Sequence, residues 1–405
     1  MDYSALMAMV PENLKEIITF QTSGTKVYGK IAIGFGLAEK VGEEAKKLGN
    51  GKIFLVTDKT ITGLGLSGIV LDSLQKAGFV VDVFDEVEPD PHLETALRVQ
   101  DLVRKSNYGV VVGLGGGSVI DMAKVASLTA TNTGDIKNYM TGNPIEQEGL
   151  PSIMMPTTSG TGSEVSSYIV LSGEDKKMFF ASPYIYPTIA LDDPLFTSTM
   201  PPKVTAATGL DALSHGVEGL IGKPGPISEA LTNKCVEYVF NFLERACNNG
   251  EDLEARFYMS FASVLGMMSY TQGGGLYAHS CSYILALYNG TPHGMGCGVT
   301  LPYTLMFNLD NIKDVLVRFA RIIDPKIQGS DEELAGITVQ NFYDLLERVN
   351  MPNNLKDLGV NADFLTDFAK DLINKYYRVR NPRPMIMEEA EKLIDSMWHG
   401  ELKQI

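Results

Sequence analysis

The stretch Val110-Val-Val-Gly-Leu-Gly-Gly-Gly-Ser118, continued by Val119-Ile-Asp-Met-Ala-Lys124, predicts the fold of the first half of this chain. Its apolar β-branched run indicates a buried strand, and the small residues after it indicate a tight turn into a helix. Backbone N–H groups at such a turn, together with the helix dipole, favour a bound pyrophosphate. The spacing differs from the usual Gly-x-Gly-x-x-Gly fingerprint, so a tight turn without a ligand is an equal alternative.

Short apolar runs alternate with helical patterns on both sides of this turn. Besides Val110–Gly113, the expected strands are 53–57, 79–84 and 153–155, and the expected helices between them include 37–48 and 93–105. Such alternation predicts a mainly parallel sheet that is covered on both faces. After Pro201-Pro202 helical patterns dominate, including 229–247, 253–270, 311–323 and 387–397.

The change from alternating strands and helices to helical patterns alone predicts two domains. We expect an α/β domain over residues 1–195, with an N-terminal arm over residues 1–25, and an all-helical domain over residues 196–405. The chain of 405 residues has a length suited to two or three domains.

Composition excludes several classes of protein. A formal net charge of −15 argues against a nucleic-acid binder, which normally needs a basic face. No apolar run is long enough to span a bilayer, and no secretory signal pattern opens the sequence. The chain has four cysteines and no Cys-x-x-Cys pair, which favours a cytoplasmic protein over one built on disulfides.

Two further features of the first half indicate a dinucleotide. A second small-residue loop, Pro156-Thr-Thr-Ser-Gly-Thr-Gly-Ser163, follows an expected strand and offers donors for phosphate, ribose or a nicotinamide amide. Asp58 follows the strand 53–57, where an acid can accept hydrogen bonds from a ribose and would repel a 2′-phosphate. That position favours NAD over NADP, although a helix cap or turn residue is an equal alternative for an isolated Asp58. Ser118 could likewise cap a helix or donate to a phosphate.

The helical half carries a pattern suited to a metal ion. Asp211 and His215 are four residues apart in a helical stretch, so their side chains share one face. His279 and His293 follow in two further segments. One carboxylate and three imidazoles suit Fe(II) or Zn(II) better than Ca(II) or Mg(II). Taken alone, an Asp-His pair at this spacing is more often an ordinary side-chain pair on a helix surface than a metal site.

In combination, these motifs resemble those of the iron-containing, group III metal-dependent alcohol dehydrogenases. The resemblance extends from about residue 26 to residue 400 and rests on five blocks in order, 115–124, 156–164, 208–218, 292–294 and Asn381-Pro-Arg-Pro384. It implies a dinucleotide-binding α/β domain, an all-helical domain and one divalent metal ion in the cleft between them, in the fold shared with dehydroquinate synthase.

The resemblance also assigns roles to individual positions. It implies that the metal ligands are Asp211, His215, His279 and His293. It implies a pyrophosphate loop made of Gly115, Gly116, Gly117 and Ser118. Nicotinamide and ribose would be lined by Asp121, Thr157, Thr158 and Lys177, and Asp58 occupies the position that usually selects NAD.

Tyr283 is a departure from the family pattern. Many members carry a histidine four residues after the third ligand, where it serves in proton transfer, and this chain has Tyr283 there. A tyrosine is also found in relatives that resemble 4-hydroxybutyrate dehydrogenase. We therefore consider Tyr283 as a catalytic proton carrier, with an aromatic wall of the substrate pocket as the alternative. Cys281 and Cys297 flank the ligand motifs and are expected to be packing residues.

The resemblance implies an oxidoreductase that transfers a hydride between NAD(H) and a small alcohol or aldehyde held at the metal ion. Iron is the expected metal, with zinc and manganese as alternatives, and a homodimer or higher homo-oligomer is the expected assembly. Alternative functions are the reduction of a small anionic aldehyde such as succinic semialdehyde or sulfoacetaldehyde, a dehydroquinate synthase-like lyase, and a non-catalytic nucleotide-binding protein.

Overall fold

A computed structural model describes residues 3–21, 29–173 and 177–405, which form two compact units. The first unit contains the residues up to Thr158 together with Gly162–Thr199, and the second contains Ser159–Thr161 and Met200–Ile405. The boundary expected between residues 195 and 196 falls inside a short 3-10 helix, η5 (Pro194–Thr199), that belongs to the first unit. Residues 1, 2 and 22–25 of the expected arm lie outside the described residues.

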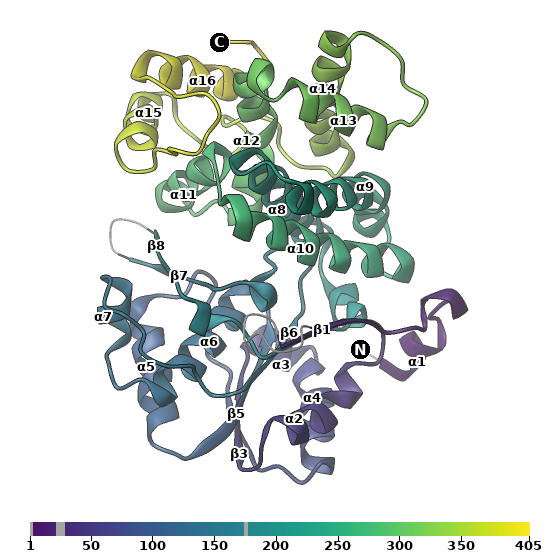
Figure 1. Cartoon of the computed structure of the whole chain (residues 1–405), viewed down its shortest axis with the longest axis vertical. Coiled ribbons are helices and arrows are strands. Elements are labelled where there is room, and N and C mark those ends of the chain that lie inside the picture. The colour runs from purple at the N-terminus through teal and green to yellow at the C-terminus, as the bar shows by residue number, and fades with distance from the viewer. Residues whose placement is uncertain (1–2, 22–28, 174–176) are drawn as a thin grey trace. The chain divides into compact units, whose positions relative to one another are not determined.

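The first unit is built on one large sheet, which confirms the expected α/β architecture (Figure 1). Within the described residues its strands follow the order β1-β2-β9-β6-β5-β3-β4. Their bounds are β1 (Ile18–Gln21), β2 (Lys30–Ile33), β3 (Lys52–Val56), β4 (Val81–Phe84), β5 (Tyr108–Gly115), β6 (Ser152–Pro156) and β9 (Ile189–Asp192). All neighbouring strands are parallel except β1 and β2, which are antiparallel. A separate hairpin joins β7 (Tyr168–Ser172) to β8 (Lys177–Ala181).

Helices cover both faces of this sheet because its strands are apolar on both sides. The helices α2 (Val41–Leu48) and α4 (Leu66–Lys76) pack together on one face, and α5 (Leu93–Arg104) and α6 (Gly117–Thr131) pack on the other, as Figure 1 shows. The expected helix 37–48 is divided into a 3-10 turn, η2 (Ala38–Lys40), and α2. Where an N-terminal arm is expected, α1 (Tyr3–Ala8) packs on the unit, and Tyr3 donates a 2.5 Å hydrogen bond to Asp193.

The connection order places a change of direction between β3 and β5. The chain runs from β3 outward to β4 and then returns past β3 to place β5 on its other side. In doubly wound sheets, ligands bind at such a reversal, beyond the carboxyl ends of the strands. Asp58 follows β3 and the glycine turn follows β5, so both lie at this point.

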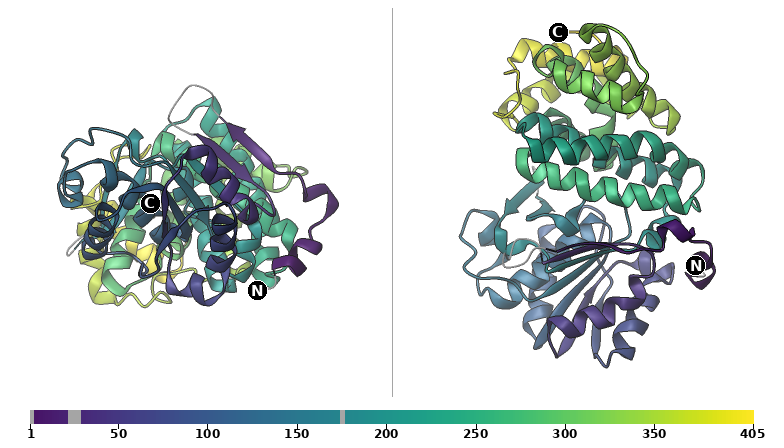
Figure 2. Two further views of the ribbon diagram at one scale, coloured as in Figure 1. Left: turned by 90° about the horizontal axis from the view of Figure 1, so that it is seen from below. Right: turned by 45° about the vertical axis from the view of Figure 1, so that its right-hand side comes forward.

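The second unit is all-helical within the described residues, as expected. Its helices are α8 (Pro202–Gly222), α9 (Pro226–Asn248), α10 (Leu253–Gly273), α11 (Tyr277–Asn289), α12 (His293–Asn308), α13 (Lys313–Ile323), α14 (Asp331–Arg348), α15 (Leu365–Asn374) and α16 (Met387–His399). The helices α8, α9 and α10 pack closely side by side, as the right-hand view in Figure 2 shows. The expected helix 311–323 begins only at Lys313, because Leu309–Asn311 forms a 3-10 turn. None of the described helices combines the length and apolarity needed to cross a membrane.

Two apolar cores hold the second unit together. One is shared by α8, α9, α10, α12, α13 and α14, and the other by α11, α12, α15 and α16. Gly219 allows α8 to lie close to α10. A Cβ at this position would lie 2.5 Å from the backbone of Ser269 and Tyr270. Real side chains do not approach backbone atoms so closely, so these helices can pack in this way only with glycine at position 219.

The close packing of α8 on α10 leads to a stability prediction. Gly219→Ala should destabilise the protein by about 1–3 kcal/mol, because the added methyl group overpacks rigid backbone. Gly336→Ala is the matched control, since a Cβ at this helical glycine meets no atom within 4 Å. It should stabilise the protein by ~0.5–1 kcal/mol through helix propensity. Thermal unfolding checks both, and equal shifts of the same sign would contradict the account.

Candidate metal centre and dinucleotide-binding loops

The four expected metal ligands converge in the second unit. The helix α8 supplies Asp211 and His215, α11 supplies His279, and α12 begins with His293. One ligand atom from each residue lies within 4.8 Å of those of the other three. Asp211 Oδ1 is 3.8 Å from His215 Nε2 and 3.7 Å from His293 Nε2. Side chains from three helices therefore point at one small volume.

Local sequence explains how these helices meet. The spacing of four residues puts Asp211 and His215 on one face of α8. Pro292 precedes α12 at its N-cap, so the helix starts at His293. A Cβ at Gly294 would lie 2.3 Å from the Ala207 carbonyl oxygen and 2.9 Å from the Asp211 Cβ. Glycine at 294 therefore lets the first turn of α12 approach α8 beside the carboxylate.

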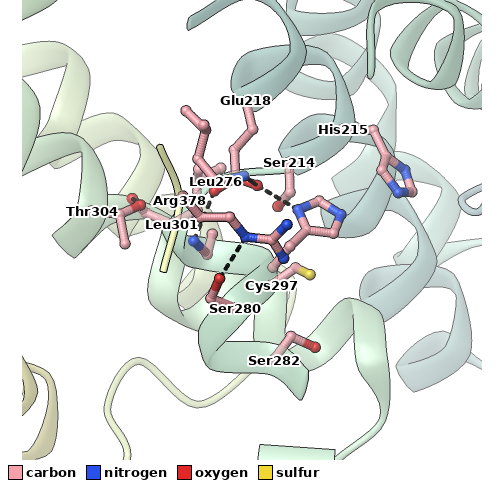
Figure 3. Close-up of polar contacts among 12 residues, drawn as sticks. Ser214, His215, Glu218, Leu276, Ser280, Ser282, Cys297, Leu301, Thr304 and Arg378 are labelled. Atoms are coloured by element: carbon pink, nitrogen blue, oxygen red, sulfur yellow. Dashed lines mark hydrogen bonds and ion pairs between the residues drawn. The ribbon is translucent and has the colours of Figure 1, made fainter. Parts of the chain in front are cut away.

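Hydrogen bonds fix the orientation of all three imidazoles. The Nδ1 atom of His279 bonds to the Glu218 carboxylate, which also accepts the backbone N–H groups of Leu276 and Ala278 (Figure 3). The Nδ1 atom of His215 lies 3.2 Å from the Gly160 carbonyl oxygen. A carbonyl oxygen only accepts, so this Nδ1 carries the proton and Nε2 carries the lone pair.

Ser282 orients His293 in the same way. Its hydroxyl donates a 2.7 Å bond to the His293 carbonyl oxygen and lies 2.8 Å from the ring Nδ1. Because a hydroxyl has one proton, Ser282 must accept from Nδ1, which leaves the lone pair on Nε2. All three rings thus direct Nε2 at the common volume. His279 Nε2 and Asp211 Oδ1 are buried there without a hydrogen-bond partner.

The electrostatics of the site favour a cation. Burial lowers the pKa of His215 well below its ordinary value and lowers the pKa of His279 to about 3. These imidazoles are therefore neutral, which is the form that binds metals. Burial also raises the pKa of Asp211 well above the usual range. Asp211 would therefore ionise only next to a positive charge, and a divalent metal ion bound by the three imidazole lone pairs would supply it.

The donor set fits the metal ion that the sequence predicts. Three nitrogens and one oxygen suit Fe(II), Zn(II) or Mn(II), whereas Ca(II) and Mg(II) prefer oxygen ligands only. The side chain of His293 is 31% exposed, against 3% for Asp211 and 6% for His215. A small molecule would therefore reach the site from the side of His293.

Aromatic residues enclose the ligands. The ring of Tyr270, on α10, lies 4.8 Å from the ring centroids of both His215 and His279. Tyr283 stacks on His293 at 5.2 Å with an interplanar angle of 15°. Burial raises the pKa of Tyr283 to about 12. Its proton-transfer role stays a prediction.

The cysteines near the ligands are buried. Cys297 Sγ lies 3.7 Å from His293 Nε2, and burial raises the pKa of this thiol well above its ordinary value. Burial also raises the pKa of Cys281. A protonated thiol is a poor ligand, which is consistent with packing roles for both residues.

In the first unit, the glycine turn lies beside residues 156–158, which begin the second small-residue loop. They follow the neighbouring strands β5 and β6, where Gly115 is in register with Pro156. The Thr157 N–H donates a 3.0 Å bond to the Gly115 carbonyl oxygen, and a Cβ at Gly116 would lie 3.6 Å from the Thr158 methyl group. Gly116 is the N-cap of α6 and Gly117 is its first residue, and the role of this turn toward a pyrophosphate stays a prediction.

Asp58 and Ser118 already have partners in the protein. Asp58 is the N-cap of α3 (Lys59–Gly63), and its Oδ1 accepts a 2.9 Å bond from the Ile61 N–H. The capping role is thus present, and the role of Asp58 toward a ribose stays a prediction. Ser118 does not cap α6, because the N-cap is Gly116, and its hydroxyl instead accepts the Asp90 N–H at 3.3 Å.

Asp121 and Lys177 are engaged within the first unit. Asp121 is buried and accepts bonds from the Ser163 hydroxyl at 2.5 Å and the Val170 N–H at 2.9 Å. Lys177 Nζ, at the start of β8, donates to Asp90 at 2.7 Å and to Ser172 at 2.8 Å. The roles of both residues toward nicotinamide and ribose stay predictions.

Comparison with known families gives a match over both units. Residues 29–194 match the model of the iron-containing alcohol dehydrogenases, and residues 205–398 match the C-terminal model of the Fe-containing alcohol dehydrogenase family. Choline dehydrogenase of Bacillus subtilis is 32% identical over 385 residues, which are 93% of this chain and 94% of that protein.

Solved structures of relatives share the fold. An alcohol dehydrogenase from Oenococcus oeni matches with a TM-score of 0.87 and 29% identity, over 91% of this chain and 98% of that one. A sulfoacetaldehyde reductase from Bifidobacterium kashiwanohense, solved in complex with NAD+, matches with a TM-score of 0.83 and 30% identity, over 93% and 98% of the two chains. Their different activities show that identity at this level does not specify a substrate.

The hydrogen bond from His279 to Glu218 leads to a metal-binding prediction. Glu218→Gln should weaken zinc affinity roughly 10- to 100-fold, because the amide nitrogen cannot accept one of the three protons that the carboxylate now receives. Glu388→Gln, on the exposed surface of α16, is the control and should bind zinc as the wild type does. Competition with a chromophoric chelator measures both. Wild-type affinity in Glu218→Gln would show that this contact does not support the ligand set.

Proposed function

The chain belongs to the iron-containing alcohol dehydrogenase family and is an oxidoreductase of that family, and on this premise we propose that it interconverts a small alcohol and its aldehyde with NAD(H). The observation that carries the proposal is the convergence of Asp211, His215, His279 and His293, with three Nε2 atoms directed at one volume. The sulfoacetaldehyde reductase that was solved with NAD+ supports the choice of dinucleotide.

The second unit supplies the groups for the chemistry on the alcohol carbon. A divalent cation held by the four ligands would polarise a carbonyl oxygen or lower the pKa of an alcohol. The chain keeps its imidazoles neutral and oriented through Glu218, Gly160 and Ser282, so no rearrangement is needed when the ion is in place. Tyr270 packs on two of the rings and limits the entry of water.

The contact between Tyr283 and His293 supports a role for this tyrosine at the substrate oxygen. Its ring stacks on His293, whose side chain is more exposed than that of Asp211. Its phenol is protonated at neutral pH. We assign it the role of a hydrogen-bond donor that orients a bound carbonyl. The wall that its ring forms would also limit the size of the substrate.

The first unit supplies the dinucleotide site. The turn Gly115–Ser118 at the start of α6 offers backbone N–H groups to a pyrophosphate, and Thr157 and Thr158 on the neighbouring loop offer donors to the nicotinamide end. Asp58, at the end of β3, lies where the sheet reverses its connection order, and its carboxylate would accept the ribose hydroxyls. We also expect a homodimer or higher homo-oligomer.

Removal of the metal ion tests the proposed function. The enzyme stripped with a chelator should lose its oxidation of NADH by a panel of short aldehydes, and reconstitution with Fe(II) or Zn(II) should restore the activity. Absorbance of the reduced nicotinamide follows the reaction. Full activity after stripping, or turnover of a substrate without net use of NADH, would contradict the proposal, and the second result would favour a lyase.

The carboxylate of Asp58 leads to a prediction about the dinucleotide. Asp58→Asn keeps an N-cap oxygen for the Ile61 N–H but removes the charge that repels a 2′-phosphate. We expect the ratio of kcat/KM for NADPH to that for NADH to rise at least about tenfold, which corresponds to ~1.4 kcal/mol. The unfolding temperature should not change. An unchanged ratio would reduce Asp58 to its capping role.

A further inference from the structure

Arg378, in the second unit, forms no ion pair with an acidic side chain among the described residues. It follows α15, and its Nε donates a 2.7 Å bond to the Ser280 hydroxyl, drawn as a dashed line in Figure 3. In the part of the chain that the structure describes, no carboxylate oxygen lies within 4.0 Å of its guanidinium nitrogens. Arg383, five residues later, is different, because it pairs with Glu389 at 2.6 Å.

Contacts place this guanidinium beside the candidate metal centre. Ser280, which holds its Nε, directly follows His279 on α11. The guanidinium carbon lies 5.8 Å from the ring centroid of Tyr283, and that ring also stacks on His293 and contacts the ring of Tyr376. The Tyr283 ring therefore contacts both Arg378 and the exposed ligand His293.

The guanidinium is held in place but keeps donor groups that no described residue uses. Its Nε bond to Ser280 and its position over the Tyr283 ring restrict rotation, while both Nη atoms have no hydrogen-bond acceptor among the described residues. A planar fork with two such donors matches the two oxygens of a carboxylate or sulfonate. A partly buried cation that has no acidic partner among the described residues is costly, so a ligand that neutralises it would gain affinity.

We propose that Arg378 binds the acid group of the substrate, and that the substrate is a short-chain aldehyde, or its alcohol, bearing a carboxylate or sulfonate. The inference rests on the proposed function, because the reacting carbon must lie at the metal centre while the acid group lies at the arginine. Tyr283 separates the two positions, and its ring would pack along the short carbon chain. Arg378 is then a specificity residue that contacts substrate away from the reacting carbon.

The test compares aldehydes that differ in charge. In the wild-type enzyme loaded with metal, kcat/KM should be higher for succinic semialdehyde and sulfoacetaldehyde than for butanal, and lowest for the cationic betaine aldehyde. In Arg378→Gln the anionic substrates should lose roughly 10- to 100-fold, mostly through KM, because a charge-assisted pair is removed. Butanal should change by less than about threefold, and Arg378→Lys should recover part of the loss.

Arg380→Gln is the matched control, because it removes the same charge from an exposed side chain that donates to the Gly273 carbonyl oxygen. It should leave the ratio of anionic to neutral substrates unchanged. Equal losses for butanal and succinic semialdehyde in Arg378→Gln would overturn the inference and reduce the arginine to a support of α11. A wild-type enzyme that does not prefer the anions would overturn it as well.

A binding measurement separates this inference from the proposed function. Calorimetric titration with isethionate or 4-hydroxybutyrate reports the anion site without any turnover. Binding that disappears in Arg378→Gln and persists in Arg380→Gln supports the inference even if no aldehyde oxidises NADH, a result that would contradict only the proposed function. Binding that is equal in all three proteins, or absent in all, would overturn the inference.

Discussion

The hydrogen bond that each of three imidazoles makes through Nδ1 is the constraint on which the chemistry of the second unit depends. Glu218, the Gly160 carbonyl and the Ser282 hydroxyl each accept one of these protons, and every ring then presents Nε2 to the same volume as Asp211. A ring flipped by any other partner would present N–H there and exclude a cation. The buried lone pairs and the carboxylate are mutually unfavourable until a metal ion is bound.

Close helix packing makes this arrangement possible. Gly219 lets α8 approach α10, which carries Tyr270, and Gly294 lets α12 approach α8 beside Asp211. The same α11 that supplies His279 also supplies Ser280 and Tyr283, which hold and face Arg378. One helix thus carries a metal ligand, the wall of the expected substrate pocket and the support of its cationic end.

Much of the fold could be predicted from local patterns. The apolar runs around Val110 and the long helical periods after Pro202 indicated an α/β unit and a helical unit, and both are confirmed. The order of the strands was not predictable, because periodicity does not state which strands pair. Local patterns also misplaced the start of α13, where a 3-10 turn occupies the first residues.

The candidate site shows the same limit. Asp211 and His215 could be paired from their spacing on one helix, whereas His279 and His293 required the family resemblance because α11 and α12 approach α8 only in the folded unit. Glu218 could have been noticed, since it lies three residues after His215 on α8. Tyr270 and Arg378 had no signal in the sequence, because their positions depend on contacts between distant segments.

X-ray absorption spectroscopy of the zinc-loaded protein tests the central claim most directly. The account predicts a first shell of nitrogen and oxygen scatterers at about 2.0–2.1 Å, with the outer-shell pattern of three imidazoles. This pattern should lose one imidazole in His279→Ala. A sulfur scatterer at about 2.3 Å, which would indicate Cys297 as a ligand, or fewer than three imidazoles in the wild type, would contradict it.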